Sequence, residues 1–376
     1  MKLLFAMTLI LSFLNASGRE ISTSDRQSIS EVVDHFILNK DAKRLDWNWE
    51  EAIGLHGLSQ LSPLLSPSQQ KNIFTYIEKY HNHWDKKNLD ISWADECPSA
   101  LSALHLGPEY YENSETNFSD VIKYLKNASL NDIGAIDHLG DNSFISRIFA
   151  PYKNSVWLDS LMMWGNLSLR TGLLFNDQQL IDLALNQPEI FSNYMQDDQT
   201  GMFIHSYNYG KDYTYPRQRL FWTRGNGWVV ATLADFLELM PKNDHRYAKI
   251  KEIFVKLVNG FLKAERKRSL WVNLYPYGKD RRVDTSGSAL IAYGLLKGAR
   301  IGVLSRMHEK AGLEVFKSIN KHLKKTKHGK RLTRVIGPTS PGPKLFYLII
   351  PYQRNSYYGH GAYFLMASEI LRNGKK

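Results

Sequence analysis

Val156-Trp157-Leu158-Asp159-Ser160-Leu161-Met162-Met163-Trp164-Gly165 is the stretch around which the rest of the chain is organised. Its apolar residues surround a helical axis, which predicts an inner helix with no face toward solvent. Asp159 stands inside this run, although a carboxylate is seldom buried without a partner because its charge loses hydration. Asp159 is therefore either the cap of the helix N-terminus, for which Ser160 is an equal candidate, or a functional carboxyl group.

The same pattern, small or polar residues that run into an apolar helix, recurs along the chain. It returns at 47–58, 93–104, 222–231, 284–293 and 358–367. More polar helices are expected between these segments, at 66–84, 118–125, 177–195, 244–261 and 305–323. Alternating apolar and polar helices predict an all-α fold of six helical hairpins, with the apolar helices as an inner ring and the polar ones as an outer ring.

Residues 1–18 have the pattern of a secretory signal peptide, with Lys2 at the start, an apolar core from Leu3 to Leu14, and Ala16-Ser17-Gly18 before the cleavage point. The apolar core is too short to span a bilayer. We therefore expect a secreted or periplasmic protein with no stable membrane anchor after cleavage. Residues 19–376 are predicted to form a single catalytic domain.

The net charge of +11 is concentrated near the C-terminus. Residues 301–376 hold 15 Lys or Arg and only 3 Asp or Glu, and the densest run is 321–331. Such a run is either a solvated helix end and loop or a binding surface for a polyanion. For an exported protein an acidic glycan is the expected partner, and nucleic acid is not. Cys97 is the only cysteine, which excludes an intramolecular disulfide and a cysteine-based metal site.

Inner helices that point the same way gather their N-termini at one mouth of the barrel. Helix N-termini favour anions through free N–H groups and the helix dipole. The polar residues expected at this mouth are Asp95, Asp159, Arg224, Asn226, Ser286 and His360.

Two carboxylates at the mouth suggest glycoside chemistry, which commonly uses a pair. Asp159 and Asp95 form the expected catalytic pair, and Asp137 is a rival for either position. His205 follows the turn Asp197–Gly201 and is expected to point toward the site. No group of residues has metal-ligand spacing, so we expect neither a metal nor another cofactor.

Trp222-Thr223-Arg224-Gly225-Asn226-Gly227-Trp228 is the most unusual heptad of the chain. Its arginine can bind a carboxylate with two parallel hydrogen bonds, and its two tryptophans offer faces on which a sugar ring can stack. The alternative is a tight helix start in which Arg224 forms a structural ion pair.

Together these motifs resemble the unsaturated glycuronyl hydrolases of glycoside hydrolase families 88 and 105, and most of all the unsaturated rhamnogalacturonyl hydrolases. Four segments carry the resemblance, namely 156–163, 201–205, 222–228 and 284–289. The resemblance implies an (α/α)6 barrel. The segment 332–352 departs from the family pattern, which bears on the choice of substrate.

The resemblance also implies a reaction. In the family an Asp protonates C4 of a C4=C5 unsaturated uronic acid and activates the water that adds at C5, after which the hemiketal rearranges and releases the remaining sugar. Asp159 matches this Asp, and Asp95 falls where the family has a second site Asp. The residues then expected to bind the anionic oligosaccharide are His205, Trp222, Arg224, Asn226, Trp228, Ser286, Ser288 and His360.

The sequence thus predicts an exported hydrolase of unsaturated galacturonyl-rhamnose fragments from rhamnogalacturonan. One alternative is the same chemistry on unsaturated glucuronyl fragments of glycosaminoglycan or ulvan type. Another is a protein that binds anionic glycans without catalysis.

Overall fold

The computed structural model describes residues 21–87, 89–140, 152–276 and 282–373. The predicted signal peptide, 1–18, lies outside these ranges. Within them, no helix combines the length and the apolar character that crossing a membrane requires.

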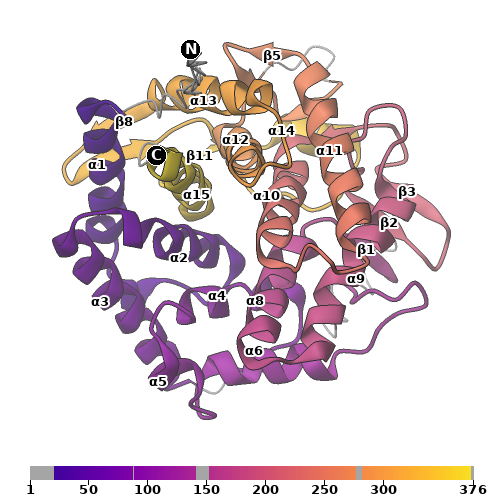
Figure 1. The fold of residues 1–376 in the computed structure, drawn as a ribbon, viewed down its shortest axis with the longest axis horizontal. Helices are drawn as coiled ribbons and strands as arrows, with labels where there is room; N and C mark the ends of the chain where they lie inside the picture. Colours follow the sequence, from indigo (N-terminus) through magenta and orange to yellow (C-terminus); the bar gives the residue numbers. More distant parts are fainter. Residues whose placement is uncertain (1–20, 88, 141–151, 277–281, 374–376) are drawn as a thin grey trace, which may run out of the picture.

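An inner ring of helices surrounds the axis of the molecule (Figure 1). Each inner helix contacts the next one in chain order, and the last packs against the first, so the ring is closed. In the described part of the chain five of these helices overlap the apolar segments, which confirms the predicted all-α (α/α)6 barrel. The inner helices are α2 (Trp49–Leu61), α4 (Ser99–Ala103), α8 (Asn166–Phe175), α10 (Thr223–Leu239), α12 (Thr285–Arg300) and α15 (Tyr357–Asn373). The helix predicted over 156–165 is wrong: residues 155–157 form a strand, 161–165 form a π-helical turn, and the inner helix α8 begins only at Asn166.

More polar helices form the outer ring, as expected from the sequence (Figure 1). Ser66 caps one of them by accepting a hydrogen bond from the backbone N–H of Gln69, and Pro67 occupies the first helical position, where its missing N–H costs nothing. The outer helices are α1 (Thr23–Asn39), α3 (Pro67–Trp84), α6 (Asn117–Asn127), α9 (Gln178–Met195), α11 (Tyr247–Lys263) and α13 (Arg306–Asn320), with the short α5 (Pro108–Tyr111) beside them.

Glycines allow neighbouring inner helices to approach at backbone distance. A Cβ atom on Gly361 of α15 would lie 2.2 Å from the carbonyl oxygen of Ile53 in α2, and one on Gly57 would lie 2.5 Å from the carbonyl oxygen of Gly361. A Cβ on Gly287 of α12 would lie 2.9 Å from the backbone nitrogen of Arg224 in α10. The close contacts of the ring therefore require residues without a side chain at these points.

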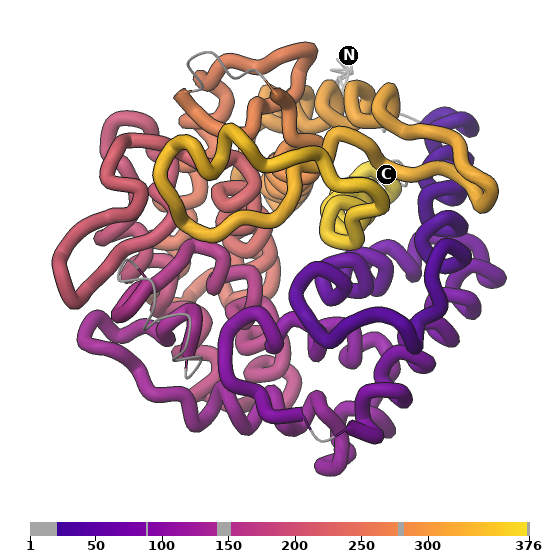
Figure 2. The backbone as a smooth tube through the Cα atoms, turned by 180° about the vertical axis from the view of Figure 1, so that it is seen from behind, coloured from indigo at the N-terminus to yellow at the C-terminus, as the bar shows by residue number. Residues whose placement is uncertain are grey.

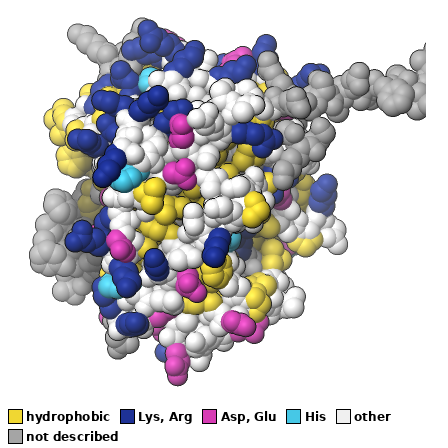
Figure 3. Space-filling model, turned by 90° about the vertical axis from the view of Figure 1, so that its left-hand side faces the viewer, with side chains coloured by type: hydrophobic (Ala, Val, Ile, Leu, Met, Phe, Trp, Pro, Cys, Tyr) yellow, Lys and Arg dark blue, Asp and Glu magenta, His cyan; other side chains and the backbone are white. Residues whose placement is uncertain are grey.

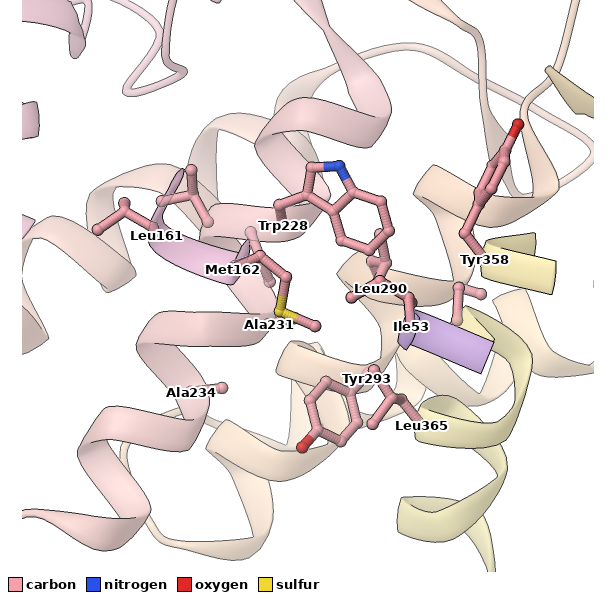
Figure 4. Packing of buried hydrophobic residues seen from close by; sticks show 14 of the residues in the cluster. Ile53, Leu161, Met162, Trp228, Ala231, Ala234, Leu290, Tyr293, Tyr358 and Leu365 are labelled. Atoms are coloured by element: carbon pink, nitrogen blue, oxygen red, sulfur yellow. The ribbon is translucent and has the colours of Figure 1, made fainter. Parts of the chain in front are cut away.

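Large apolar side chains fill the space that the inner helices enclose. Trp228, Met162, Leu290, Tyr293 and Leu365 come from four different inner segments and point toward one another (Figure 4). All of them are buried. Because packed side chains fill the axis, the described part of the barrel leaves no room for a functional site in its centre.

A buried ion cluster ties the C-terminal halves of several inner helices together. Asp235 of α10 accepts from Lys297 of α12 at 2.6 Å and from Arg170 of α8 at 3.1 Å. Glu369 of α15 pairs with Arg300 of α12 at 2.6 Å. Burial opposes charge on Asp235, yet its cationic neighbours lower its pKa below the usual range. Buried ion pairs between neighbouring inner helices therefore stabilise this end of the barrel.

Short β-strands lie at the other end of the barrel, where the inner helices begin. β1 (Ser155–Trp157) pairs with β2 (Ser206–Asn208), which pairs with β3 (Tyr213–Tyr215). Residues 206–215 therefore form a β-hairpin. The other two-residue strands are β4 (Phe221–Trp222) with β7 (Leu274–Tyr275), β5 (Arg266–Lys267) with β6 (Leu270–Trp271), and β10 (Val335–Ile336) with β11 (Tyr352–Gln353).

The basic run 321–331 is a β-hairpin rather than the predicted helix end and loop. Helix α13 ends at Asn320, and β8 (Leu323–Thr326) pairs with β9 (Gly329–Leu332). Lys330 is anchored to Glu31 of α1 at 2.9 Å. The side of the molecule that carries α1 and this hairpin shows many Lys and Arg side chains (Figure 3).

Substitution of Gly361 by alanine tests the close contact between α2 and α15. The added Cβ meets backbone, which cannot rotate away, so we expect a loss of about 1–3 kcal/mol in the free energy of unfolding, measured with urea. Gly165→Ala is the matched control, because its Cβ would meet the Phe236 ring edge at 3.3 Å and should cost little. Equal stability of the two variants would contradict this packing model.

Candidate active site

Asp159 and His205 are brought together by the pairing of β1 with β2. Trp157 is opposite Ser206 in this antiparallel ladder, and the backbone N–H of Leu158 donates to the carbonyl of His205 at 3.0 Å. Asp159 follows Leu158, and His205 precedes Ser206, so this pairing brings their side chains together. Nε2 of His205 lies 3.0 Å from Oδ2 of Asp159. The register of two short strands thus positions the pair.

The backbone and the side chain of Asp159 have different partners. Its carbonyl accepts from the backbone N–H groups of Met162 and Met163, which open the π-helical turn η4 (Leu161–Gly165) that leads into α8. Its carboxylate pairs with His205 instead of capping these N–H groups. The side chain keeps 12% of its area exposed. The carboxylate therefore does not cap the helix and stays partly exposed, and a catalytic role of Asp159 stays a prediction.

Aromatic rings enclose His205. Its ring lies 4.4 Å from that of Trp222 and 6.2 Å from that of Trp157, measured between centroids. Burial lowers the pKa of His205, although the nearby carboxylate of Asp159 acts in the opposite direction. Burial therefore favours the neutral imidazole, which can act as a hydrogen-bond partner or as a base.

The second carboxylate, Asp95, is also paired with a histidine. Its Oδ1 lies 3.4 Å from Nε2 of His138, and its side chain keeps 13% of its area exposed. The ring of His138 stacks on Trp157 at 4.3 Å, and its Nδ1 lies 2.9 Å from the hydroxyl of Ser160. Asp95 thus joins the same mouth through His138 and Trp157.

Asp137, the rival carboxylate, belongs to a neighbouring surface. It accepts from Asn131 at 2.7 Å and from the Tyr209 hydroxyl at 2.9 Å, and it lines a hollow of about 600 Å³. Burial raises its pKa. The residue of this segment that contacts the site is its neighbour His138. In the part of the chain that the structure describes, no three His, Cys, Asp or Glu side chains gather as metal ligands.

Comparison with known proteins places this chain in a family. A family model described as Glycosyl Hydrolase Family 88 matches residues 23–374. The chain belongs to glycosyl hydrolase family 88. The resemblance found in the sequence is thereby confirmed, and with it the assignment to the glycoside hydrolases.

Relatives extend over most of the family 88 chain. Unsaturated rhamnogalacturonyl hydrolase YesR of Bacillus subtilis is 19% identical over 94% of this chain and 97% of its own length. Unsaturated 3S-rhamnoglycuronyl hydrolase of an Alteromonas species is 25% identical over 57% of this chain. That match covers 51% of the Alteromonas protein, so this chain spans about half of it.

Solved structures share the fold. A family 105 glycoside hydrolase of C. acetobutylicum superposes with a TM-score of 0.80 at 21% identity, over 92% of this chain and 99% of that one. The unsaturated glucuronyl hydrolase of Bacillus sp. GL1 gives a TM-score of 0.67 at 15% identity, over 92% and 96%.

In this family 88 chain the side chain of Arg224 is fully buried. Its Nη1 donates to the carbonyl of Ile336 at 2.6 Å and its Nη2 to that of Gly337 at 2.7 Å, while Asp284 lies 3.5 Å away. The Cζ atom of the guanidinium also lies 4.8 Å from the ring centroid of Trp222 and 4.8 Å from that of Tyr358. The structural ion pair considered from the sequence is present, and binding of substrate by Arg224 stays a prediction.

Four other predicted binding residues also have protein partners. Asn226 grips the backbone N–H and carbonyl of Phe203 at 2.7 and 2.9 Å, which holds the strand leading to His205. His360 donates to the Ser356 carbonyl and accepts from the Leu332 N–H. Ser286 donates to Asp284, and Ser288 accepts from the Trp271 N–H. These contacts position the mouth, and a direct role of the four in binding substrate is untested.

The indole N–H groups of Trp222 and Trp228 are available as hydrogen-bond donors. In the described ranges, the indole Nε1 of each is buried and has no hydrogen-bond partner. Trp222 lies against His205, whereas Trp228 lies deeper, edge-on to Trp49 at 6.4 Å. Trp222 is thus the tryptophan of this pair placed at the Asp159–His205 site.

Two residues of the site escaped the sequence analysis. His138 was passed over in favour of the adjacent carboxylate. Tyr347 comes from α14 (Lys344–Ile349), and its hydroxyl lies 2.7 Å from Nδ1 of His205. The only sequence signal for Tyr347 was that 332–352 departs from the family pattern.

Arg224→Lys tests the structural role of the guanidinium. The ammonium of lysine lacks the planar fork that donates to two carbonyls from separate nitrogens and stacks on aromatic rings, so we expect a loss of about 2–3 kcal/mol in unfolding free energy and faster hydrogen exchange over 335–350. The control Arg217→Lys changes an exposed guanidinium 4.3 Å above the Tyr213 ring and should have little effect. Unchanged exchange over 335–350 in the Arg224 variant would refute this role.

Proposed function

We propose that this protein removes the C4=C5 unsaturated uronic acid from the non-reducing end of lyase-generated oligosaccharides. The observation that carries the proposal is the Asp159–His205 pair at the barrel mouth, in a chain of family 88. We further propose unsaturated galacturonyl-rhamnose from rhamnogalacturonan as the substrate. The name of the Bacillus subtilis relative, which aligns with nearly the whole chain, supports that substrate.

The chemistry assigns separate roles to the two oxygens of Asp159. His205 holds Oδ2, which leaves Oδ1 to carry the proton delivered to C4 of the vinyl ether. The resulting carboxylate then takes a proton from the water that adds at C5, so the acid is regenerated. The hemiketal opens by breaking the bond from C5 to the ring oxygen, which leaves a ketone at C5 and a hemiacetal at C1. The hemiacetal then collapses to an aldehyde, and the remaining sugar leaves with its hydroxyl. Such general acid–base action contributes about 10²–10⁴-fold in rate.

Asp95 is the second carboxylate of the proposal. Its partial exposure and its pairing with His138 support a role in holding a hydroxyl group of the unsaturated ring. Trp157 separates the two carboxylate–histidine pairs and offers an aromatic edge between them.

A cationic groove on the same end supports an acidic substrate. Arg331, Arg334 and Arg354 line a hollow of about 420 Å³. Clustered arginines suit carboxylate or sulfate groups. This groove also favours the alternative substrate, an unsaturated glucuronyl unit on a sulfated or ulvan-type chain, and the name of the Alteromonas relative points the same way.

We also propose that the protein is secreted or periplasmic, because residues 1–18 have the pattern of a signal peptide. When the full chain is expressed in a bacterial host, N-terminal sequencing of the exported protein should begin near Arg19. Recovery of the uncleaved chain from the cytosol alone would contradict export.

The test of activity uses lyase-treated rhamnogalacturonan, chondroitin and ulvan fragments and follows the ultraviolet absorbance of the C4=C5 acid. We expect loss of absorbance with the rhamnogalacturonan fragments. Loss with another substrate alone would support the glucuronyl alternative, and binding of fragments without loss on any would support the non-catalytic alternative.

Asp159→Asn should lower the turnover number by about 10²–10⁴-fold while the fold stays intact, because an amide cannot donate the required proton. Asp198→Asn is the matched control, since that carboxylate is 97% exposed and pairs with Lys256. Circular dichroism checks the fold of both variants. Substantial residual activity of the Asp159 variant would show that another group is the acid.

A further inference from the structure

The segment 333–353 lies across the mouth of the barrel, on the face nearest the viewer in Figure 2. Its short helix α14 buries one residue deeply. Tyr347 is 0% exposed, whereas Leu345 and Ile349 on the same helix are 62% and 65% exposed. Tyr347 packs with Leu220, Trp222 and Leu274. The helix therefore inserts a single tyrosine into the site.

Several side chains of the barrel hold this segment by hydrogen bonds to its backbone carbonyls. Arg224 holds the carbonyls of Ile336 and Gly337, as described above. Arg282 donates to the carbonyl of Ile350 at 2.6 Å and also to those of Tyr347 and Leu348. Asn273 donates to the carbonyl of Tyr347 at 2.8 Å. The position of the tyrosine ring is thus determined on both sides of the inserted residue.

The hydroxyl of Tyr347 links two groups. The backbone N–H of Gly342 donates to its oxygen at 3.3 Å, and Nδ1 of His205 lies 2.7 Å from the same oxygen. Burial raises the pKa of Tyr347, so the hydroxyl keeps its proton. The Gly342 N–H can only donate, so of these two partners Nδ1 is the one able to accept the hydroxyl proton.

We propose that Tyr347 is a positioning residue that fixes the tautomer of His205: its hydroxyl donates to Nδ1, so the imidazole proton resides on Nε2 and is donated to Oδ2 of Asp159. The opposite tautomer would place the lone pair of Nε2 against a carboxylate oxygen, which is repulsive. The link from Gly342 through Tyr347 and His205 to Asp159 then orients the carboxyl group, so that Oδ1 is the oxygen left for the substrate. The catalytic consequence rests on the proposed function of Asp159, whereas the tautomer itself does not.

The charged and titratable groups near His205 come from several elements. Asp159 precedes η4 and Tyr347 is on α14, while Arg224 on α10 and the neighbouring His138 act to lower the pKa of His205. The two last groups disfavour a doubly protonated imidazole, in line with a neutral ring held between one donor and one acceptor.

The direct test is nitrogen NMR of the whole protein with ¹⁵N-labelled histidine, in which the His205 signals are assigned by their loss in His205→Gln. We expect a protonated Nε2 and an unprotonated Nδ1 in the unaltered protein. A proton on Nδ1 would overturn the proposal, and this result does not depend on any variant or substrate.

Tyr347→Phe keeps the ring and removes the hydroxyl. We expect the His205 signals to move toward a mixture of tautomers and kcat to fall about tenfold, as for loss of one hydrogen bond, with little change in KM. Tyr358→Phe is the matched control: its hydroxyl donates to the Ile336 carbonyl at 2.6 Å and holds the same segment without touching His205. It should change neither the tautomer nor kcat.

Equal effects of the two tyrosine variants would show that anchoring of the segment, and not the hydroxyl proton, is what matters. Unchanged His205 signals and kcat in Tyr347→Phe would also overturn the proposal. If the unaltered protein acts on no unsaturated uronide but shows the expected tautomer and its loss in Tyr347→Phe, the proposed function fails and the positioning role stands.

Discussion

The fully buried guanidinium of Arg224 is the interaction on which the mouth of this barrel depends. Removing a cation from water costs several kcal/mol unless its partners replace the lost hydration. Here the partners are two carbonyls of the C-terminal segment, a carboxylate that begins α12, and two aromatic faces. Because these partners come from different parts of the chain, the cation fixes the relative positions of α10, α12 and the segment that carries Tyr347.

The Asp159–His205 pair is positioned on this frame by backbone register. The β1–β2 ladder sets Asp159 beside His205, Asn226 grips the backbone of Phe203 just before the histidine, and Tyr347 closes the other side of the ring. Each contact is local in itself, yet together they leave the carboxyl group of Asp159 with one oxygen engaged and a small exposed area. Packed side chains fill the axis of the barrel, so the pair lies at an end of the barrel and not in its centre.

Much of this arrangement could be predicted from the sequence, for identifiable reasons. The inner helices are apolar on all sides and rich in glycine because they touch at backbone distance, as at Gly361 and Ile53. A carboxylate inside such a run, as at Asp159, requires a special explanation. The roles of Asn226, Ser286 and His360 were harder to predict, because helix starts and sugar binding demand the same polar residues. Tyr347 could not be found, since its contact with His205 spans 142 residues and follows no periodic pattern.

We propose that Asp159 delivers a proton to C4 of an unsaturated uronic acid, and proton NMR of the first product formed in D₂O tests this step. We expect one deuterium at C4, added from a single face, and disappearance of the double bond at the rate at which the remaining sugar is released. Release of a sugar that still contains the C4=C5 double bond, with no deuterium at C4, would show ordinary glycosidic cleavage at C1 and would exclude this step.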